Sequence, residues 1–157
     1  MKNINIGIVG TGVGIRTHLK GFRGVNGCNV LAIAGSSSER SNFFAEKNDI
    51  PIACANYKEL CDIPEIDLVC VCPPNKFHYD VMKYAISKGK NIICEKPVSH
   101  ITSEVEQLTH LEKKEGSFIY VDHQLRFNPY MRKIKELIHS GVLGHIYLVR
   151  INQLGIG

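Results

Sequence analysis

Short apolar runs that alternate with helical stretches constrain the fold of this chain more than any other feature. Strands are expected at 4–9, 30–34, 68–72, 92–94 and 118–121, and helices at 15–23, 39–47, 57–60, 77–87, 102–114 and 130–139. Strands alternating with helices connect by right-handed crossovers into a parallel sheet that is covered on both faces. The continuously apolar run Leu68–Cys72 suits a central, doubly buried strand. The predicted fold class is α/β, with a doubly wound parallel sheet.

Length and composition indicate a globular protein. The 157 residues are enough for one well-buried domain and too few for two ordinary ones. The net charge of +4 comes from Lys and Arg residues scattered among acids, which argues against a nucleic-acid partner. The apolar stretches are strand-sized and no export leader is recognisable, so we also expect no membrane partner.

The cysteine pattern predicts reduced, buried thiols. Six cysteines occupy positions 28, 54, 61, 70, 72 and 94, mostly inside apolar runs and with no Cys-x-x-Cys pair. In a strand, Cys70 and Cys72 point to the same face. Small apolar fillers are expected rather than zinc ligands, so no metal site and a cytoplasmic location are predicted.

A glycine run follows the first expected strand, in the stretch IGIVGTGVGIRTH from Ile6 to His18. It suits either a tight turn alone or a loop that cradles a phosphate, and the strand–helix setting is that of a dinucleotide fingerprint. Gly10 permits the turn, and Gly12 lets backbone approach a pyrophosphate at the helix N-terminus. With Val13 and Gly14 these are predicted cofactor contacts. Gly14 stands one place before the third glycine of G-x-G-x-x-G, so Ile15 is expected where helix meets sheet.

The end of the second strand bears on the choice of cofactor. An acid there hydrogen-bonds the ribose of NAD, but this strand runs into Gly35-Ser-Ser-Ser38 without a carboxylate. Ser36 and Ser37 can donate to a 2′-phosphate and Arg40 can pair with it, which favours NADP slightly over NAD. Alternatively, Ser38 only caps the helix and Arg40 faces solvent.

Three later segments complete a pattern. Val71–His78 reads VCPPNKFH, Asn91–Val98 reads NIICEKPV and Asp122–Pro129 reads DHQLRFNP. Together with the glycine run they resemble the Gfo/Idh/MocA family of nicotinamide-dependent oxidoreductases over essentially the whole chain. The resemblance implies a Rossmann domain over 1–127. It also implies, over 128–157, a crossover helix and the start of a truncated substrate and oligomerisation domain.

The stretch 145–153 reads as one more strand. It either pads the edge of the first domain or begins the second.

The residues after each strand are expected to meet at one rim of the sheet, because ligands of open parallel sheets bind beyond the carboxyl ends of the strands. Pro73 and Pro74 stiffen a loop, and Asn75 offers an amide to a ribose or caps the next helix. By resemblance His78 lies in the cofactor loop; a helix-surface histidine is the alternative. Arg126, by resemblance, lies near the nicotinamide, or it braces the crossover in an ion pair.

Lys96 is the predicted catalytic residue. Hydride transfer from an alcohol leaves a developing alkoxide, which an ammonium can polarise or relieve of its proton. Glu95 is expected to orient Lys96 or to touch the cofactor ribose. Both residues are therefore included among the predicted cofactor contacts.

The predicted function is an NAD(P)-dependent oxidoreductase that moves hydride between nicotinamide and a sugar, polyol or similar small molecule. By resemblance the full-length protein is a homo-oligomer. The alternatives are a non-catalytic dinucleotide-binding or regulatory module and a truncated remnant, since fold alone does not fix function.

Overall fold

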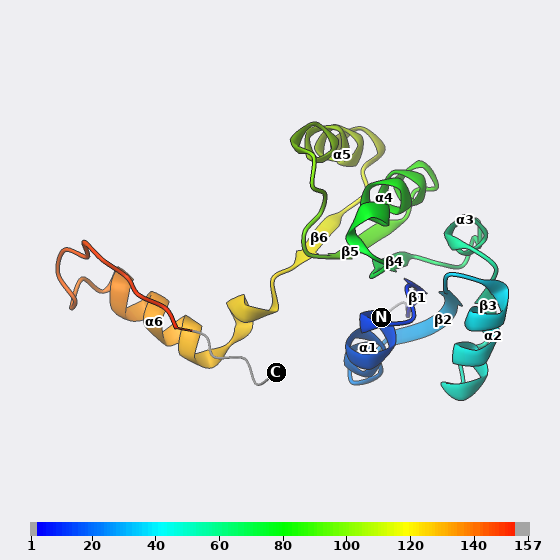
Figure 1. Ribbon diagram of the computed structural model, residues 1–157, viewed down its shortest axis with the longest axis horizontal. Coiled ribbons are helices and arrows are strands. Elements are labelled where there is room, and N and C mark those ends of the chain that lie inside the picture. Colours follow the sequence, from blue (N-terminus) through cyan, green and yellow to red (C-terminus); the bar gives the residue numbers. More distant parts are fainter. Residues whose placement is uncertain (1–2, 153–157) are drawn as a thin grey trace. The chain divides into compact units, whose positions relative to one another are not determined.

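A parallel six-stranded sheet organises the first of two compact units, which divide between Asp122 and His123 in the computed structural model (Figure 1). The structure describes residues 3–152. The strands are β1 (Ile4–Val9), β2 (Cys28–Ala34), β3 (Ile52–Cys54), β4 (Leu68–Val71), β5 (Asn91–Glu95) and β6 (Ile119–Asp122), in the order β3-β2-β1-β4-β5-β6. This is the doubly wound order, in which the direction of winding changes between β1 and β4.

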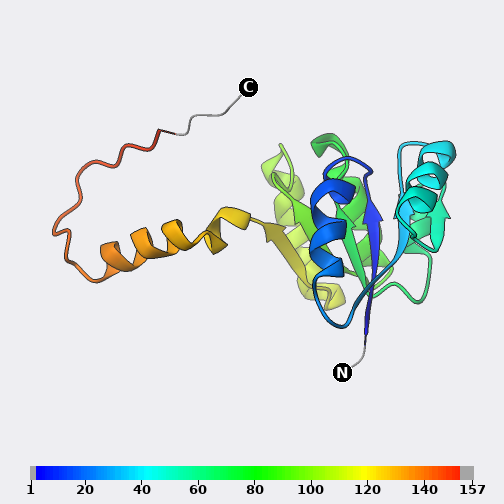
Figure 2. The same ribbon diagram turned by 90° about the horizontal axis from the view of Figure 1, so that it is seen from below.

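Helices cover both faces of the sheet (Figures 1 and 2). The helical segments of the first unit are η1 (Gly14–Leu19), α1 (Lys20–Arg23), α2 (Ser38–Lys47), α3 (Tyr57–Cys61), η2 (Asn75–Phe77), α4 (His78–Ser87) and α5 (Thr102–Glu115). η1 and α2 bury Leu19 and Ala45 in one core, whereas α3, α4 and α5 contribute to the other. Strand β4 contributes side chains to both cores, because its residues alternate between the two faces of the sheet.

The five predicted strands and the predicted helices are confirmed, with ends shifted by one or two residues. The sequence reading missed β3, because a three-residue edge strand directly after Pro51 carries too short an apolar pattern to detect. No described helix is both long enough and apolar enough to cross a bilayer.

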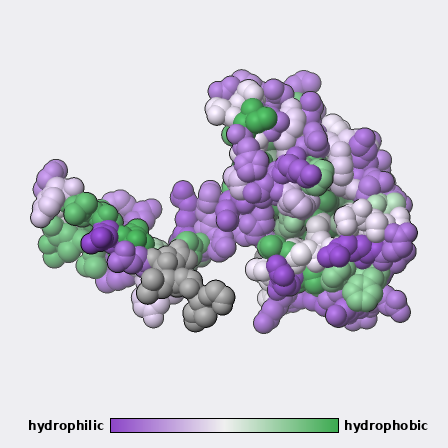
Figure 3. Space-filling model, in the orientation of Figure 1, coloured by the Kyte–Doolittle hydropathy of each residue, from purple (hydrophilic) through white to green (hydrophobic). Residues whose placement is uncertain are grey.

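The second unit contains η3 (Gln124–Phe127) and α6 (Pro129–His139). Asn128 caps α6, accepting hydrogen bonds from the backbone N–H groups of Tyr130 and Met131. Apolar side chains on α6 and the segment after it are exposed (Figure 3). The predicted domain boundary between 127 and 128 stays a prediction.

The strand predicted at 145–153 is wrong for the described part, since 145–152 forms no strand and position 153 lies outside the described residues. A strand exists only where its backbone pairs with a neighbour, and apolar alternation alone does not supply one. The α/β fold class therefore rests on the six-stranded sheet, and residues 145–152 add no strand to it.

Two glycines let the turn after β1 approach the end of β4. Gly10 has φ +112°, and a Cβ there would meet the Cys72 carbonyl oxygen at 2.5 Å. A Cβ on Gly14 would meet Cγ2 of Ile8 at 2.7 Å. Gly14 therefore provides a close contact between helix and sheet, and Ile15 packs against the same core, as expected.

Replacing Gly14 by alanine is predicted to destabilise the fold by about 1–3 kcal/mol, because fully buried Ile8 cannot move away from the new methyl group. Gly21→Ala is the matched control. It lies in exposed helix with open space around it, and gains up to about 1 kcal/mol from helix propensity. Urea unfolding measures both. Equal midpoints for the two variants would contradict the proposed contact.

Candidate functional site

A cavity of about 720 Å³ opens at the carboxyl ends of β1, β2 and β4. Its lining includes eight of the predicted cofactor residues: Gly10, Gly12, Val13, Ser36, Arg40, Pro73, Pro74 and Asn75. The cavity lies at the point where the winding of the sheet reverses, the usual ligand position in open parallel sheets. The fold thus brings together three loops that are far apart in the sequence.

Within the glycine turn, Gly10 and Gly12 have different roles. The Gly10 N–H donates to the Ala34 carbonyl at 2.8 Å and so joins the ends of β1 and β2. A Cβ on Gly12 would meet nothing within 4 Å, although Gly12 lines the cavity. Packing within the first unit therefore does not require a glycine at position 12. The missing side chain leaves room for a ligand to approach the backbone.

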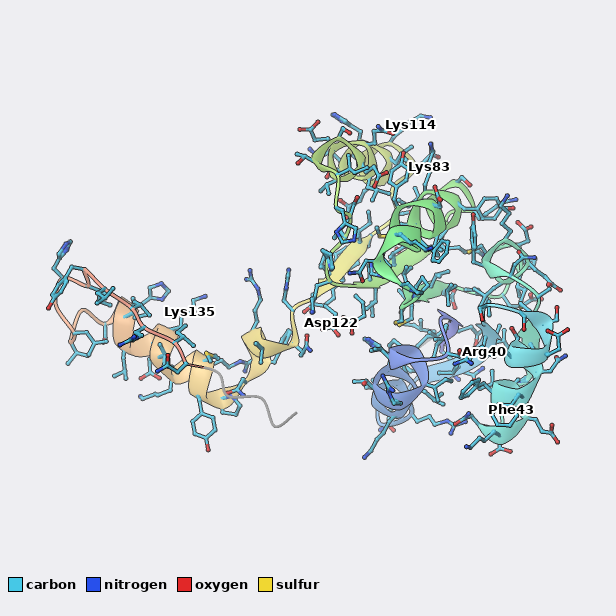
Figure 4. All side chains as sticks on the ribbon, viewed as in Figure 1. Arg40, Phe43, Lys83, Lys114, Asp122 and Lys135 are labelled. Carbon is cyan, nitrogen blue, oxygen red and sulfur yellow. The ribbon has the colours of Figure 1, made fainter. Side chains whose placement is uncertain are left out.

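Arg40 is held at the cavity by two contacts. Its Nε donates to Thr11 Oγ1 at 2.6 Å, and its guanidinium carbon lies 5.2 Å from the centre of the Phe44 ring. Figure 4 shows Arg40 on α2, beside the end of β2. Arg40 is exposed, as the alternative expected, but these contacts hold its side chain at the cavity that Ser36 also lines.

Ser37 has a structural role. Its hydroxyl accepts a hydrogen bond from the Arg40 N–H at 3.3 Å and forms the N-cap of α2. The cap predicted for Ser38 is therefore made by Ser37, which is absent from the cavity lining. Ser37 as a phosphate donor stays a prediction.

His78 is buried rather than on a helix surface, as the alternative had it. Its Nε2 lies 2.9 Å from the Pro73 carbonyl oxygen and its Nδ1 2.7 Å from the Pro97 carbonyl oxygen. The ring joins the loop after β4 to the loop after β5. His78 therefore holds these two loops together without lining the cavity. Its place in a cofactor loop stays a prediction.

The Glu-Lys-Pro segment follows β5. Lys96 is exposed, the Lys96–Pro97 peptide bond is cis, and the Lys96 N–H donates to Glu95 Oε2 at 3.3 Å. Glu95 therefore fixes the backbone that carries Lys96. Neither residue lines the cavity. Arg126 belongs to the second unit, in η3, and its proximity to the nicotinamide stays a prediction.

The sequence reading missed a polar cluster under these loops. The His18 side chain is only 9% exposed, and its Nε2 lies 3.0 Å from Glu95 Oε1 and 3.6 Å from Asp122 Oδ2. Figure 4 shows Asp122 at the end of β6. On the other side, a His18 ring nitrogen lies within 4.8 Å of the sulfurs of Cys70 and Cys72, which are 3.3 Å apart. The sequence signal for this cluster was that Cys70 and Cys72 point to the same face of their strand.

These donor atoms lie within 4.8 Å of one another in two overlapping sets, one with the sulfurs and one with the carboxylates. Two of these contacts are within hydrogen-bonding distance: the Cys70 sulfur with the Cys72 sulfur, and the His18 imidazole with the Glu95 carboxylate. We therefore describe the cluster as a hydrogen-bonded network.

Comparison with known proteins decides the family. Residues 4–123 match the family GFO_IDH_MocA, described as "Oxidoreductase family, NAD-binding Rossmann fold". The chain belongs to this family. The Gfo/Idh/MocA resemblance predicted from the motifs is thereby confirmed, as are the Rossmann fold class and a cofactor of the NAD or NADP type.

Relatives give the context of this Gfo/Idh/MocA domain. The uncharacterized oxidoreductase YrbE of Bacillus subtilis is 29% identical over 97% of this chain and 45% of its own length. The trans-1,2-dihydrobenzene-1,2-diol dehydrogenase of Xenopus tropicalis is 32% identical over 77% of this chain and 37% of its own. An NAD binding oxidoreductase from Klebsiella pneumoniae, 24% identical, has the same fold with a TM-score of 0.83 over 90% of this chain and 40% of its own. The chain thus spans less than half the length of these relatives.

In this Gfo/Idh/MocA domain the cluster shifts the pKa values of His18 and Cys72 in opposite directions. The hydrogen bond to Cys72 is the largest cause that raises the pKa of His18, to about 9. The hydrogen bond from Cys70, followed by that from His18, lowers the pKa of Cys72 to about 6, against the opposing effect of burial. Both directions favour a thiolate at Cys72 beside an imidazolium at His18.

We predict that these shifted pKa values are visible in the NMR resonances of His18 but contribute little to the pH dependence of stability. The raised His18 pKa alone stabilises the fold below about 6.5, an effect lost as pH rises through 9; the lowered Cys72 pKa alone stabilises above 9, an effect lost as pH falls through 6. Because folded and unfolded chains bind nearly equal numbers of protons in this range, the opposite pH slopes of the two effects cancel. The His18 ring resonances should titrate near pH 9, while this pair adds little slope to unfolding free energy between pH 6.5 and 9. A His18 midpoint near 6.5 contradicts the assignment, and His18→Gln identifies the resonances.

Proposed function

We propose that this chain is the dinucleotide-binding part of an NAD(P)-dependent oxidoreductase that transfers hydride between nicotinamide and a sugar, a polyol or a similar hydroxylated small molecule. The observation that carries the proposal is the cavity at the switch point of the sheet, where Gly12 presents bare backbone. The name of one relative, a dehydrogenase of a dihydrobenzene diol, supports a hydroxylated substrate.

The residues present fit a dinucleotide. Gly12 and Val13 would hold the pyrophosphate through backbone amides at the start of η1, and Asn75 would contact a ribose. Ser36 and Arg40 would recognise the adenosine end, where a 2′-phosphate gives the tethered guanidinium a charge-assisted hydrogen bond. This arrangement favours NADP.

The bound nicotinamide supplies the acceptor or donor of the hydride. Lys96 Nζ would donate to the substrate oxygen and hold its proton as the carbon–hydrogen bond forms or breaks. Glu95 positions the Lys96 backbone from below, and His18 in turn holds the Glu95 carboxylate. His78 fixes the two loops relative to each other through their carbonyl groups.

Gly12→Val is predicted to weaken dinucleotide binding at least tenfold without lowering stability, because the new side chain projects into open cavity rather than into the packed interior. Gly21→Val, on an exposed helix surface, is the matched control and should bind normally. Calorimetric titration with NADPH and NADH measures the effect. The proposal fails if the unmodified chain binds neither nucleotide.

Arg40→Gln is predicted to weaken NADPH binding roughly tenfold to a hundredfold and to leave NADH binding within about twofold, since only NADPH carries the phosphate that pairs with the guanidinium. Lys47→Gln makes the same charge change at the other end of α2 and serves as the control. Equal losses for both nucleotides would assign Arg40 to general electrostatics and contradict the NADP preference.

Lys96→Ala is predicted to keep nucleotide affinity within about twofold and to reduce turnover by roughly a hundredfold or more, because the exposed ammonium acts only on the reacting oxygen. Turnover is followed by NAD(P)H absorbance with a panel of vicinal diols and polyols, using the protein that contains this domain. Unchanged turnover would remove Lys96 from the mechanism. Tight nucleotide binding with no turnover on any substrate would favour the alternative of a regulatory binding module.

A further inference from the structure

Cys72 occupies an unusual position at the floor of the cavity. It directly follows β4, is 7% exposed and lines the cavity together with Gly10 and Gly12. Its sulfur lies 3.9 Å from the position that a Cβ on Gly14 would take. Cys72 therefore lies where the glycine turn, the end of β4 and the cavity meet.

The surroundings of Cys72 stabilise a negative charge on its sulfur. Cys70, 3.3 Å away, is the thiol that keeps its proton and donates to Cys72, because its own pKa is raised well above the ordinary value by that hydrogen bond and by burial. The His18 imidazole, with a ring nitrogen within 4.8 Å of the Cys72 sulfur, also lowers the pKa of that thiol. Glu95 acts in the opposite sense but is itself bonded to His18, and the Cys94 thiol stays protonated because burial raises its pKa to about 12.

We propose that Cys72 is a nucleophilic thiolate and a site of covalent modification by small, uncharged carbon electrophiles that enter through the cavity. Among the six cysteines it combines a neighbouring thiol, an imidazole within 4.8 Å and a place in the cavity lining. The thiolate, not the thiol, is the attacking species in such reactions.

The reaction with iodoacetamide is balanced without any other reagent. The Cys72 sulfur donates an electron pair to the methylene carbon, a carbon–sulfur bond forms, and the carbon–iodine bond breaks. Iodide leaves with the bonding pair, and the product is a neutral thioether beside the His18 imidazolium. No proton moves in the step, so the rate follows the thiolate population.

The test is the pH dependence of iodoacetamide labelling at each cysteine, read by peptide mass spectrometry on the folded chain with EDTA present. Labelling of Cys72 should be the fastest at pH 7 and should change less than about twofold between pH 7 and 8.5. Cys54 is an internal control, because burial raises its pKa to about 11, and any labelling there should rise about tenfold per pH unit. A tenfold rise per unit at Cys72, or labelling no faster than at the other cysteines, overturns the proposal.

Two variants separate the causes. Cys70→Ala removes the S–H donor and His18→Gln removes the cation, so each should lower the Cys72 rate at pH 7 at least fivefold and restore a rise with pH. Circular dichroism checks folding, and either folded variant suffices. A folded variant with the unmodified rate and profile overturns the proposed activation.

A last arm rests on the proposed function. Saturating NADPH should slow labelling of Cys72 by at least tenfold while leaving Cys54 unchanged. Flat, fast labelling without protection still supports the thiolate and counts against the position assigned to the nucleotide. Loss of the flat profile counts against the thiolate alone.

Discussion

The contact between the glycine turn and the end of β4 is the constraint on which the site depends. Gly10 leaves no room for a side chain against the Cys72 carbonyl, and its N–H is bonded to Ala34. The Cys72 N–H in turn donates to the Val9 carbonyl at 2.8 Å. These contacts bring the ends of three strands together, so the cavity forms directly above them. Any side chain at Gly10 would push the turn away from β4 and remove the floor of the cavity.

Hydrogen bonds from two histidines extend this arrangement across the rest of the sheet edge. His18 connects η1 with the ends of β4, β5 and β6 through Cys72, Glu95 and Asp122. His78 connects the loops after β4 and β5 through backbone carbonyls. Neither ring lines the cavity, yet both determine where its loops and Lys96 lie. A thiolate–imidazolium pair at this place would leave neither charge buried alone, because Cys70 lies beside the sulfur and Glu95 beside the imidazole.

Much of the fold and part of the site could be predicted from sequence. The long apolar run of β4 and the glycines after β1 specify a buried parallel strand and a turn by local chemistry, and the loops after the strands converge because parallel strands end on one side. The limits are equally specific. β3 is too short for a periodic signal, and the apolar stretch 145–152 has the pattern of a strand without a pairing partner. Ile15 packs against the core as expected, but the tight approach of Gly14 to Ile8 depends on the packed positions of helix and strand.

The sequence by itself determined the alternating architecture, the glycine turn and the motifs that identify the family, since each depends on residues close together in the chain. Tertiary structure alone decided that Ser37 caps a helix, that His78 supports the loops from behind, and that His18, Cys70, Cys72, Glu95 and Asp122 form one network. Those five side chains come from four different elements of the fold. Hydrogen bonding and ionisation depend on distances of a few ångströms between them, and only the packed sheet sets such distances.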